Sequence, residues 1–136
     1  MSDNFNNHNN PLNQKTRLQK ELGSTFIASI VADLIFTLLT CGLYNIFIQS
    51  RQIRALNFML GIKKYSFGTW ALFSLLTCGL YHVYHEYIMC QDIEKITGRT
   101  TQLPLACLLL SLFGMSIVAD AIQQNEINRH YGGSAL

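Results

Sequence analysis

The chain has 136 residues, of which 49% are hydrophobic and only 13% charged, and its net charge is +2. An ordinary soluble domain carries about 25% charged residues, so this composition favours a membrane protein over a soluble helical bundle. The small net charge, and the absence of a basic stripe interleaved with aromatic residues, argue against a nucleic-acid-binding protein.

The first 22 residues are polar. Six asparagines precede position 14, and Lys15, Arg17 and Lys20 follow as a basic collar. A cleavable signal peptide would need an apolar core here, so none is predicted. We expect a disordered, water-exposed tail at residues 1–22 and a membrane domain at residues 23–133.

Three apolar runs follow, at residues 24–48, 66–90 and 103–122. Each is long enough to form a spanning helix, which needs roughly 20 residues. The segment LLTCGLY occurs twice, at residues 38–44 and 75–81, and LLSLFG at 109–114 is a degraded third copy. An internal repeat at this spacing predicts an all-α fold: a multi-helix integral membrane protein built from three helix-break-helix repeats, at about 23–61, 66–98 and 104–133.

The repeated motif predicts a structural hinge. Glycine weakens a helix interior and permits backbone angles that other residues resist. The threonine can hydrogen-bond a carbonyl one turn back, and the tyrosine suits a membrane interface. The predicted hinge residues are Thr40, Gly42 and Tyr44 in the first unit, Thr77, Gly79 and Tyr81 in the second, and Gly114 in the third. Gly61, Gly98 and Gly132 are predicted helix C-caps.

The sequence leaves two topologies open. In the first, each unit is one kinked span, and the lysines and arginines are then shared equally between the two sides of the membrane. In the second, each unit is a hairpin or re-entrant helix pair that enters and leaves on one face, which gathers every basic segment on the cytoplasmic side.

Five polar residues in the apolar runs are candidate functional groups. His82, His85 and Glu86 share one helical face. Two structural roles are open for this face, to line the bundle or to meet lipid headgroups. Two functional roles are also open at this spacing, metal binding and proton relay. A carboxylate inside a membrane is costly, so Asp33 and Asp120 are expected to face the protein interior, a partner subunit or water. No complete metal-ligand set can be assigned, and the prediction is no metal site and no cofactor.

Two other residue types have predicted roles. Trp70 is expected to anchor the second unit at the membrane interface. The four cysteines, Cys41, Cys78, Cys90 and Cys107, form no CxxC pair and are interpreted as small packing residues.

The repeated T-x-G-[LI]-Y motif resembles a bacterial integral-membrane family known only as a domain of unknown function. The similarity extends over about residues 24–132 and includes the DIEKITG close of the second unit and the LSLFG segment followed by IVADAIQQNEIN. The resemblance implies several helices and a location in the bacterial inner membrane, multi-pass or re-entrant. It implies no reaction, ligand or catalytic residue.

No catalytic triad, phosphate loop or HExxH string is present, so an enzyme is not expected. The first functional hypothesis is a non-enzymatic membrane protein that works by helix packing and self-association, as a scaffold, accessory subunit or curvature-favouring hairpin protein. The alternative is an oligomeric pore or a proton or ion pathway. The expected partners are the lipid bilayer and further copies of the chain or another membrane protein, not nucleic acid.

Overall fold

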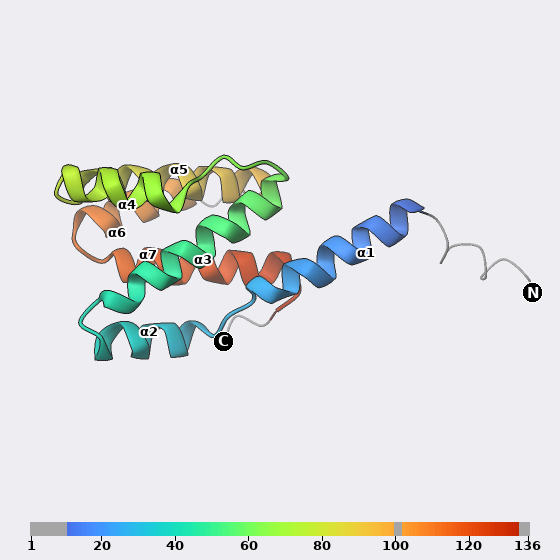
Figure 1. The fold of residues 1–136 in the computed structure, drawn as a ribbon, viewed down its shortest axis with the longest axis horizontal. Coiled ribbons are helices and arrows are strands. Elements are labelled where there is room, and N and C mark those ends of the chain that lie inside the picture. Colours follow the sequence, from blue (N-terminus) through green and yellow to red (C-terminus); the bar gives the residue numbers. More distant parts are fainter. Residues whose placement is uncertain (1–10, 100–101, 134–136) are drawn as a thin grey trace, which may run out of the picture.

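The computed structural model describes residues 11–99 and 102–133, and within these residues the fold is all-α, with no strand. Figure 1 shows three helix pairs side by side, in which a short helix turns back into a longer one. The described helices are α1 (Pro11–Gly23), the 3-10 helix η1 (Ser24–Phe26), α2 (Ile30–Leu39), α3 (Leu43–Leu60), α4 (Phe67–Leu76), α5 (Leu80–Thr97), α6 (Leu103–Leu112) and α7 (Ser116–His130).

The disordered tail predicted for residues 1–22 differs from the structure, which places α1 at Pro11–Gly23. Proline suits the first turn of a helix, and the leucines, lysines and glutamines that follow have high helix propensity. Helix α1 extends from the body of the protein (Figure 1). The remainder of the predicted tail, residues 1–10, lies outside the described residues.

The two identical LLTCGLY segments adopt the same backbone. Gly42 and Gly79 both have φ of +92°, and the preceding cysteines, Cys41 and Cys78, have φ of +51° and +52°. The Thr40 hydroxyl donates to the carbonyl of Phe36 at 2.8 Å and accepts from the backbone N–H of Tyr44 at 2.9 Å. This threonine therefore joins the end of the short helix to the start of the long one.

The second and third turns follow a similar plan. The Thr77 hydroxyl donates to the Phe73 carbonyl at 2.7 Å and accepts from the N–H of Tyr81 at 2.9 Å. The third turn lacks a threonine, and Gly114, with φ of +75°, carries the reversal between α6 and α7. At each turn the chain reverses direction, and each long helix contacts the short helix that precedes it.

The three pairs form a ring. The long helices α3, α5 and α7 all contact one another. Each short helix contacts its own long helix and one further long helix: α2 lies against α3 and α7, α4 against α5 and α3, and α6 against α7 and α5. The short helices therefore fill the three outer grooves between the long helices, and the buried core lies along the long helices' inner faces.

Aliphatic side chains fill one part of this core. Leu56, Ile93 and Ile127 have no significant exposed surface and come from α3, α5 and α7 respectively. Burying a side chain of this size contributes about 1.5–3 kcal/mol of transfer free energy. Gly61 and Gly98 are the left-handed C-caps of α3 and α5. The C-cap of α7 is Tyr131 instead, and Gly132, also left-handed, follows it.

The interpretation of all four cysteines as packing residues is wrong for two of them. Cys90 in α5 and Cys107 in α6 form a buried disulfide, because the two helices are close neighbours and the residues face each other across the contact. Cys41 and Cys78 are free thiols and lie exposed at the first two turns.

By length and composition, one helical segment of the described chain could cross a membrane. That segment is Pro11–Leu39, which includes α1 and α2. The helices Phe67–Leu76 and Leu103–Leu112 are also apolar but shorter.

Candidate functional site

A cluster of polar side chains occupies the centre of the ring, where the three long helices meet. The side-chain amide of Gln49 in α3 donates to Glu86 Oε1 in α5 at 2.5 Å and to Asp120 Oδ1 in α7 at 2.6 Å. The exposed fractions of these three residues are 0%, 0% and 2%. One amide therefore joins two buried carboxyl groups from different helices, and we refer to Gln49, Glu86 and Asp120 as the central cluster.

The three members of the central cluster occupy matching positions in the sequence. Gln49, Glu86 and Asp120 precede Gly61, Gly98 and Gly132, respectively, by the same number of residues. Matching positions on three helices that pack around one axis come together at that axis, as they do in a symmetric oligomer. The geometry of the ring therefore explains why these residues meet although they are far apart in the chain.

A second layer of glutamines supports the central cluster. The Gln123 side-chain amide donates to Glu86 Oε2, and the Gln52 amide donates to the backbone carbonyl of Asp120 at 2.8 Å. Both glutamines are fully buried. Glu86 thus accepts hydrogen bonds on both carboxyl oxygens, from α3 and from α7, and it cannot change its position without breaking both.

Asp33 lies beside the central cluster and forms an ion pair with Arg51. The Arg51 guanidinium donates to both carboxylate oxygens of Asp33, and the same Arg51 Nη2 donates to Gln124 Oε1 at 3.3 Å. This ion pair ties α2 to α3 and α7. The ion pair offsets the free-energy cost of burying the Asp33 carboxylate in an apolar run, because a paired and hydrogen-bonded charge can be buried.

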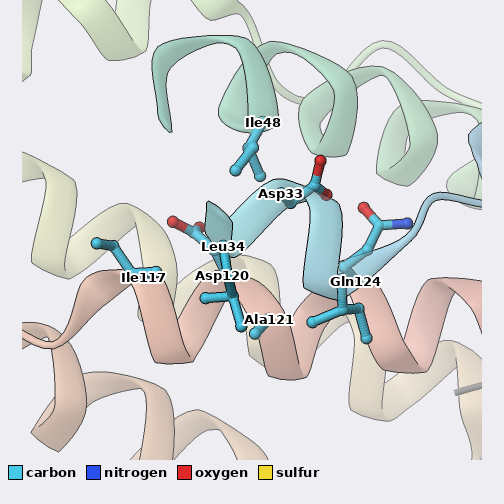
Figure 2. A pocket seen from close by; sticks show the side chains of 8 residues that line it. Asp33, Leu34, Ile48, Ile117, Asp120, Ala121 and Gln124 are labelled. Atoms are coloured by element: carbon cyan, nitrogen blue, oxygen red, sulfur yellow. The ribbon is translucent and has the colours of Figure 1, made fainter. Parts of the chain in front are cut away.

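A small cavity separates Asp33 from Asp120. Figure 2 shows the residues that line it, which include Asp33, Asp120 and the apolar Leu34, Ile48 and Ile117. Its volume is about 10 Å³. A cavity needs about 10–15 Å³ to hold one water molecule, so the space admits one water at most and is no channel.

Of the two histidines, His82 lies beside Glu86. His82 Nδ1 accepts a hydrogen bond from the Trp70 indole N–H at 3.2 Å, and the same nitrogen lies 3.8 Å from Glu86 Oε1. An imidazole nitrogen that accepts a hydrogen bond carries no proton, so His82 is neutral in this arrangement. Trp70 is buried and not an interfacial anchor, because its ring packs between Phe67 and His82.

Burial also keeps His85 neutral. It packs edge-on against Tyr65 with ring centroids 5.3 Å apart, and its Nδ1 has no hydrogen-bond partner within the described part of the chain. Burial, together with the nearby His82, lowers the pKa of His85 to about 4. Neither histidine therefore supplies a positive charge to the central cluster at neutral pH.

The environment of the two central carboxyl groups favours their protonated forms. Burial, and then the neighbouring Asp120, raises the pKa of Glu86 above its usual range despite the amide hydrogen bonds from Gln49 and Gln123. Burial raises the pKa of Asp120 to about 7, against the opposing influence of the Asn45 and Gln49 amides. Desolvation is the dominant cause for both groups.

The five polar candidates from the sequence thus separate into three arrangements. Glu86 and Asp120 share the side-chain amide of Gln49, and Asp33 lies next to them in an ion pair with Arg51. His82 lies beside Glu86, whereas His85 packs against aromatic rings. Among the described residues, no three groups of His, Cys, Asp or Glu are placed to hold one metal ion.

Sequence reasoning missed the polar partners of these groups, namely Gln49, Gln52, Arg51, Gln123 and Gln124. A signal existed for Gln49, since it aligns with Glu86 between the first two units. Counting back from Gly132 would have brought Asp120 into the same alignment. The extra residue that displaces the third turn obscured this match.

The hinge residues lie away from the central cluster, at one end of the protein. Figure 1 shows the three turns together at the end opposite α1. Within residues 30–47, 67–84 and 103–118, which form these turns and their flanking helices, the charged residues are limited to the buried Asp33. We refer to this part of the surface as the apolar end.

Large apolar side chains are exposed over the whole apolar end. Those at least partly open to solvent are Val31, Ile35, Phe36, Leu38, Leu39, Leu43, Ile46, Phe47, Leu72, Phe73, Leu75, Leu76, Leu80, Tyr84, Leu105, Leu109, Leu112, Phe113, Met115 and Val118. Soluble monomers rarely expose a continuous apolar surface of this kind, which is typical of contact with lipid or with another protein.

Residues 65–125 match a protein family described as a domain of unknown function (DUF4234). The match includes α4, α5, α6 and the first part of α7, and with them Glu86 and Asp120. Searches of curated proteins and of solved structures gave no match.

Proposed function

We propose that this chain is a non-enzymatic protein of the bacterial inner membrane, built from three helix-break-helix repeats whose hairpin tips insert into the lipid bilayer. The apolar end is the observation that carries the proposal. Its exposed side chains would be unfavourable in water, at about 25 cal/mol for each Å² of apolar surface. Lipid removes this cost without any further protein partner.

The lengths of the helices support insertion from one side. The short helices α2, α4 and α6 have ten residues each, so each is about 15 Å long, which is half of the roughly 30 Å hydrocarbon core. A hairpin with such a short arm reaches the middle of the bilayer and returns. The re-entrant topology is therefore favoured over a chain of complete spans.

The charges support the same orientation. The exposed lysines and arginines all lie outside the apolar end, namely Lys15, Arg17, Lys20, Arg54, Lys63, Lys64, Lys95, Arg99 and Arg129. Basic residues beside a membrane segment are retained on the cytoplasmic side. With the tips in the bilayer, these residues would face the cytoplasm or its anionic lipid surface.

The proposed mode of action is mechanical. Three wedges that enter one leaflet, together with association of several copies through the apolar helix faces, would make the protein a scaffold, an accessory subunit or a curvature-favouring element. Detergent-solubilised mass and liposome imaging test this part. A strictly monomeric particle that leaves liposome shape unaltered would contradict it.

Insertion is tested by a matched pair of substitutions. Leu75 is 79% exposed at the second turn, and Ile62 is 61% exposed at the opposite end of the protein. We expect Leu75→Glu to reduce the fraction recovered with liposomes after an alkaline wash, and Ile62→Glu to leave that fraction unchanged. Equal recovery of both variants and the wild type, or a wild type that stays monodisperse in buffer without detergent, would contradict insertion at the tips.

The alternative proposal, an oligomeric pore or a proton or ion pathway, has one observation in its favour. Glu86 and Asp120 are buried carboxyl groups without a paired cation, as proton-conducting sites often are. The small cavity beside Asp120 offers no continuous route within one chain, so the pathway would have to run between copies. Unchanged proton or ion flux of Asp33→Asn and Asp120→Asn in reconstituted liposomes would exclude these residues as conductors.

A further inference from the structure

We propose that Glu86 and Asp120 together form a proton-binding site that holds at least one proton at neutral pH. The ligand is a proton from solvent, which forms an O–H bond with one carboxylate oxygen and changes no other bond. The proposal concerns the centre of the ring and is independent of how the apolar end is covered.

The described titratable groups that face the pair supply no net positive charge. On α2 and α3, the described titratable groups facing it are Asp33 and Arg51, and these two neutralise each other in an ion pair. On α5, His82 accepts the Trp70 N–H on the nitrogen nearest Glu86 and so brings no positive charge. Helix α4 has no titratable residue, and the one thiol of α6, Cys107, is in the disulfide.

The pair is therefore left without a counter-charge. Glu86 and Asp120 are 0% and 2% exposed, and they share the single amide group of Gln49, so their charges could be screened neither by water nor by distance. Two neighbouring buried carboxylates cannot both ionise at ordinary pH, and one keeps its proton.

Hydrogen-bond donors are also too few around the pair. Three oxygens in and around the pair have no donor among the described residues: Asp120 Oδ2, Gln49 Oε1 and Gln123 Oε1. The two glutamine oxygens belong to the amides that donate to Glu86. A protonated carboxyl group has one O–H to donate, so a bound proton supplies a donor where acceptors are in excess.

The proton is expected to control the packing of the long helices. While it is bound, the pair carries at most one negative charge, and α3, α5 and α7 are held together through Gln49. Its loss at alkaline pH would leave two negative charges in contact between α5 and α7. Burial raises the pKa of both groups, that of Asp120 to about 7, so the proton is lost as the pH rises.

Infrared spectroscopy of the wild-type protein in detergent tests the proposal directly. We expect the carbonyl stretching band of a protonated carboxylic acid at neutral pH, shifted by transfer to deuterated water. Glu86→Gln or Asp120→Asn should reduce the band. The matched control is Asp92→Asn, because Asp92 is also buried but accepts from Lys64 at 2.5 Å and is ionised, so this variant should retain the band.

Several outcomes would overturn the proposal. They are the absence of the band in the wild type at neutral pH, an unchanged band in both Glu86→Gln and Asp120→Asn, and a band that appears only after sodium is removed, which would make a metal cation the occupant. If neither variant folds, carbon-13 labelling of glutamate or aspartate carboxyls in the wild type identifies the residue type. A band that shifts with neither label would reject the site.

Discussion

Asn128 binds both backbone polar groups of Ala28, a residue one hundred positions earlier. Its side chain accepts from the Ala28 N–H at 3.1 Å and donates to the Ala28 carbonyl at 2.8 Å. Asn57 holds Tyr65 in the same way, at 2.8 Å and 2.7 Å. Ala28 and Tyr65 each lie directly before the N-cap residue of a short helix. The last long helix thus fixes the start of the first short helix, and this contact closes the ring.

We expect Asn128→Ala to destabilise the fold by about 1–3 kcal/mol, because the substitution leaves a partly buried N–H and carbonyl without partners. Thermal unfolding followed by circular dichroism in detergent measures the loss. Asn57→Ala is the comparison, since it removes the equivalent pair of hydrogen bonds to Tyr65 and leaves Ala28 untouched. A stability of Asn128→Ala equal to that of the wild type would mean that the ring does not depend on this closure.

Removal of the Arg51 side-chain charge alone should lower the stability of the fold more than removal of the whole ion pair. Arg51→Met leaves the Asp33 carboxylate buried and unpaired, and breaking such a pair costs about 3–5 kcal/mol. The double variant Asp33→Leu/Arg51→Met replaces both charges with apolar groups and should recover most of this stability. A double variant no more stable than Arg51→Met in the same unfolding experiment would refute the role assigned to the pair.

Gly79 and Gly68, two glycines of the same helix pair, should respond differently to substitution by alanine. Gly79 has φ of +92°, and no atom lies within 4 Å of the place that an alanine methyl group would take, so Gly79→Ala meets backbone strain but no clash. We expect it to cost about 1–2 kcal/mol. Gly68 lies within α4 without a positive φ, so Gly68→Ala should stabilise by about 0.5–1 kcal/mol. Equal effects of the two substitutions on the unfolding midpoint would contradict the hinge geometry.

The surroundings of Asp92 predict that the free energy of unfolding decreases at acidic pH. Burial acts to raise its pKa, but hydrogen bonds from Lys64 and Tyr65 and the charges of Lys64 and Lys95 outweigh burial and lower the pKa below its usual value. A carboxyl group whose pKa is lower in the folded state stabilises the protein above the pKa of the unfolded chain. That stabilisation is lost as the pH falls through the folded-state pKa.

The measurement is the difference in unfolding free energy between the wild type and Asp92→Asn. We expect this difference to be constant near neutral pH and to shrink toward acid. A difference that grows as the pH falls would reverse the sign and reject the assignment.

The all-α class and the positions of most helices along the chain could be predicted from the sequence because their signals are local. The apolar runs, the two LLTCGLY segments and the glycines that end the long helices place most helix ends within a few residues. Helix α1 was missed because its residues are polar, and a polar segment next to an asparagine-rich stretch resembles a disordered tail.

The central cluster could be predicted only in part. The cost of a carboxylate in an apolar run identified Asp33 and Asp120, and the helical face shared with His82 and His85 identified Glu86. Their partners could not be found this way, because Gln49 and Arg51 are joined to them by contacts between distant helices, and glutamine alone carries no chemical signature. The Cys90–Cys107 disulfide was missed for the same reason, since four cysteines allow three pairings and spacing alone does not choose among them.

The ring of three helix pairs has a consequence for the residues at its three axial positions. Each short helix is held partly by a long helix of a different pair, so a single pair has an incomplete set of neighbours. Identical pairs would have to associate as three copies to complete such a ring, and they would then carry the same residue at all three axial positions. In this single chain the axial positions differ, with an amide at Gln49 and an acid at both Glu86 and Asp120.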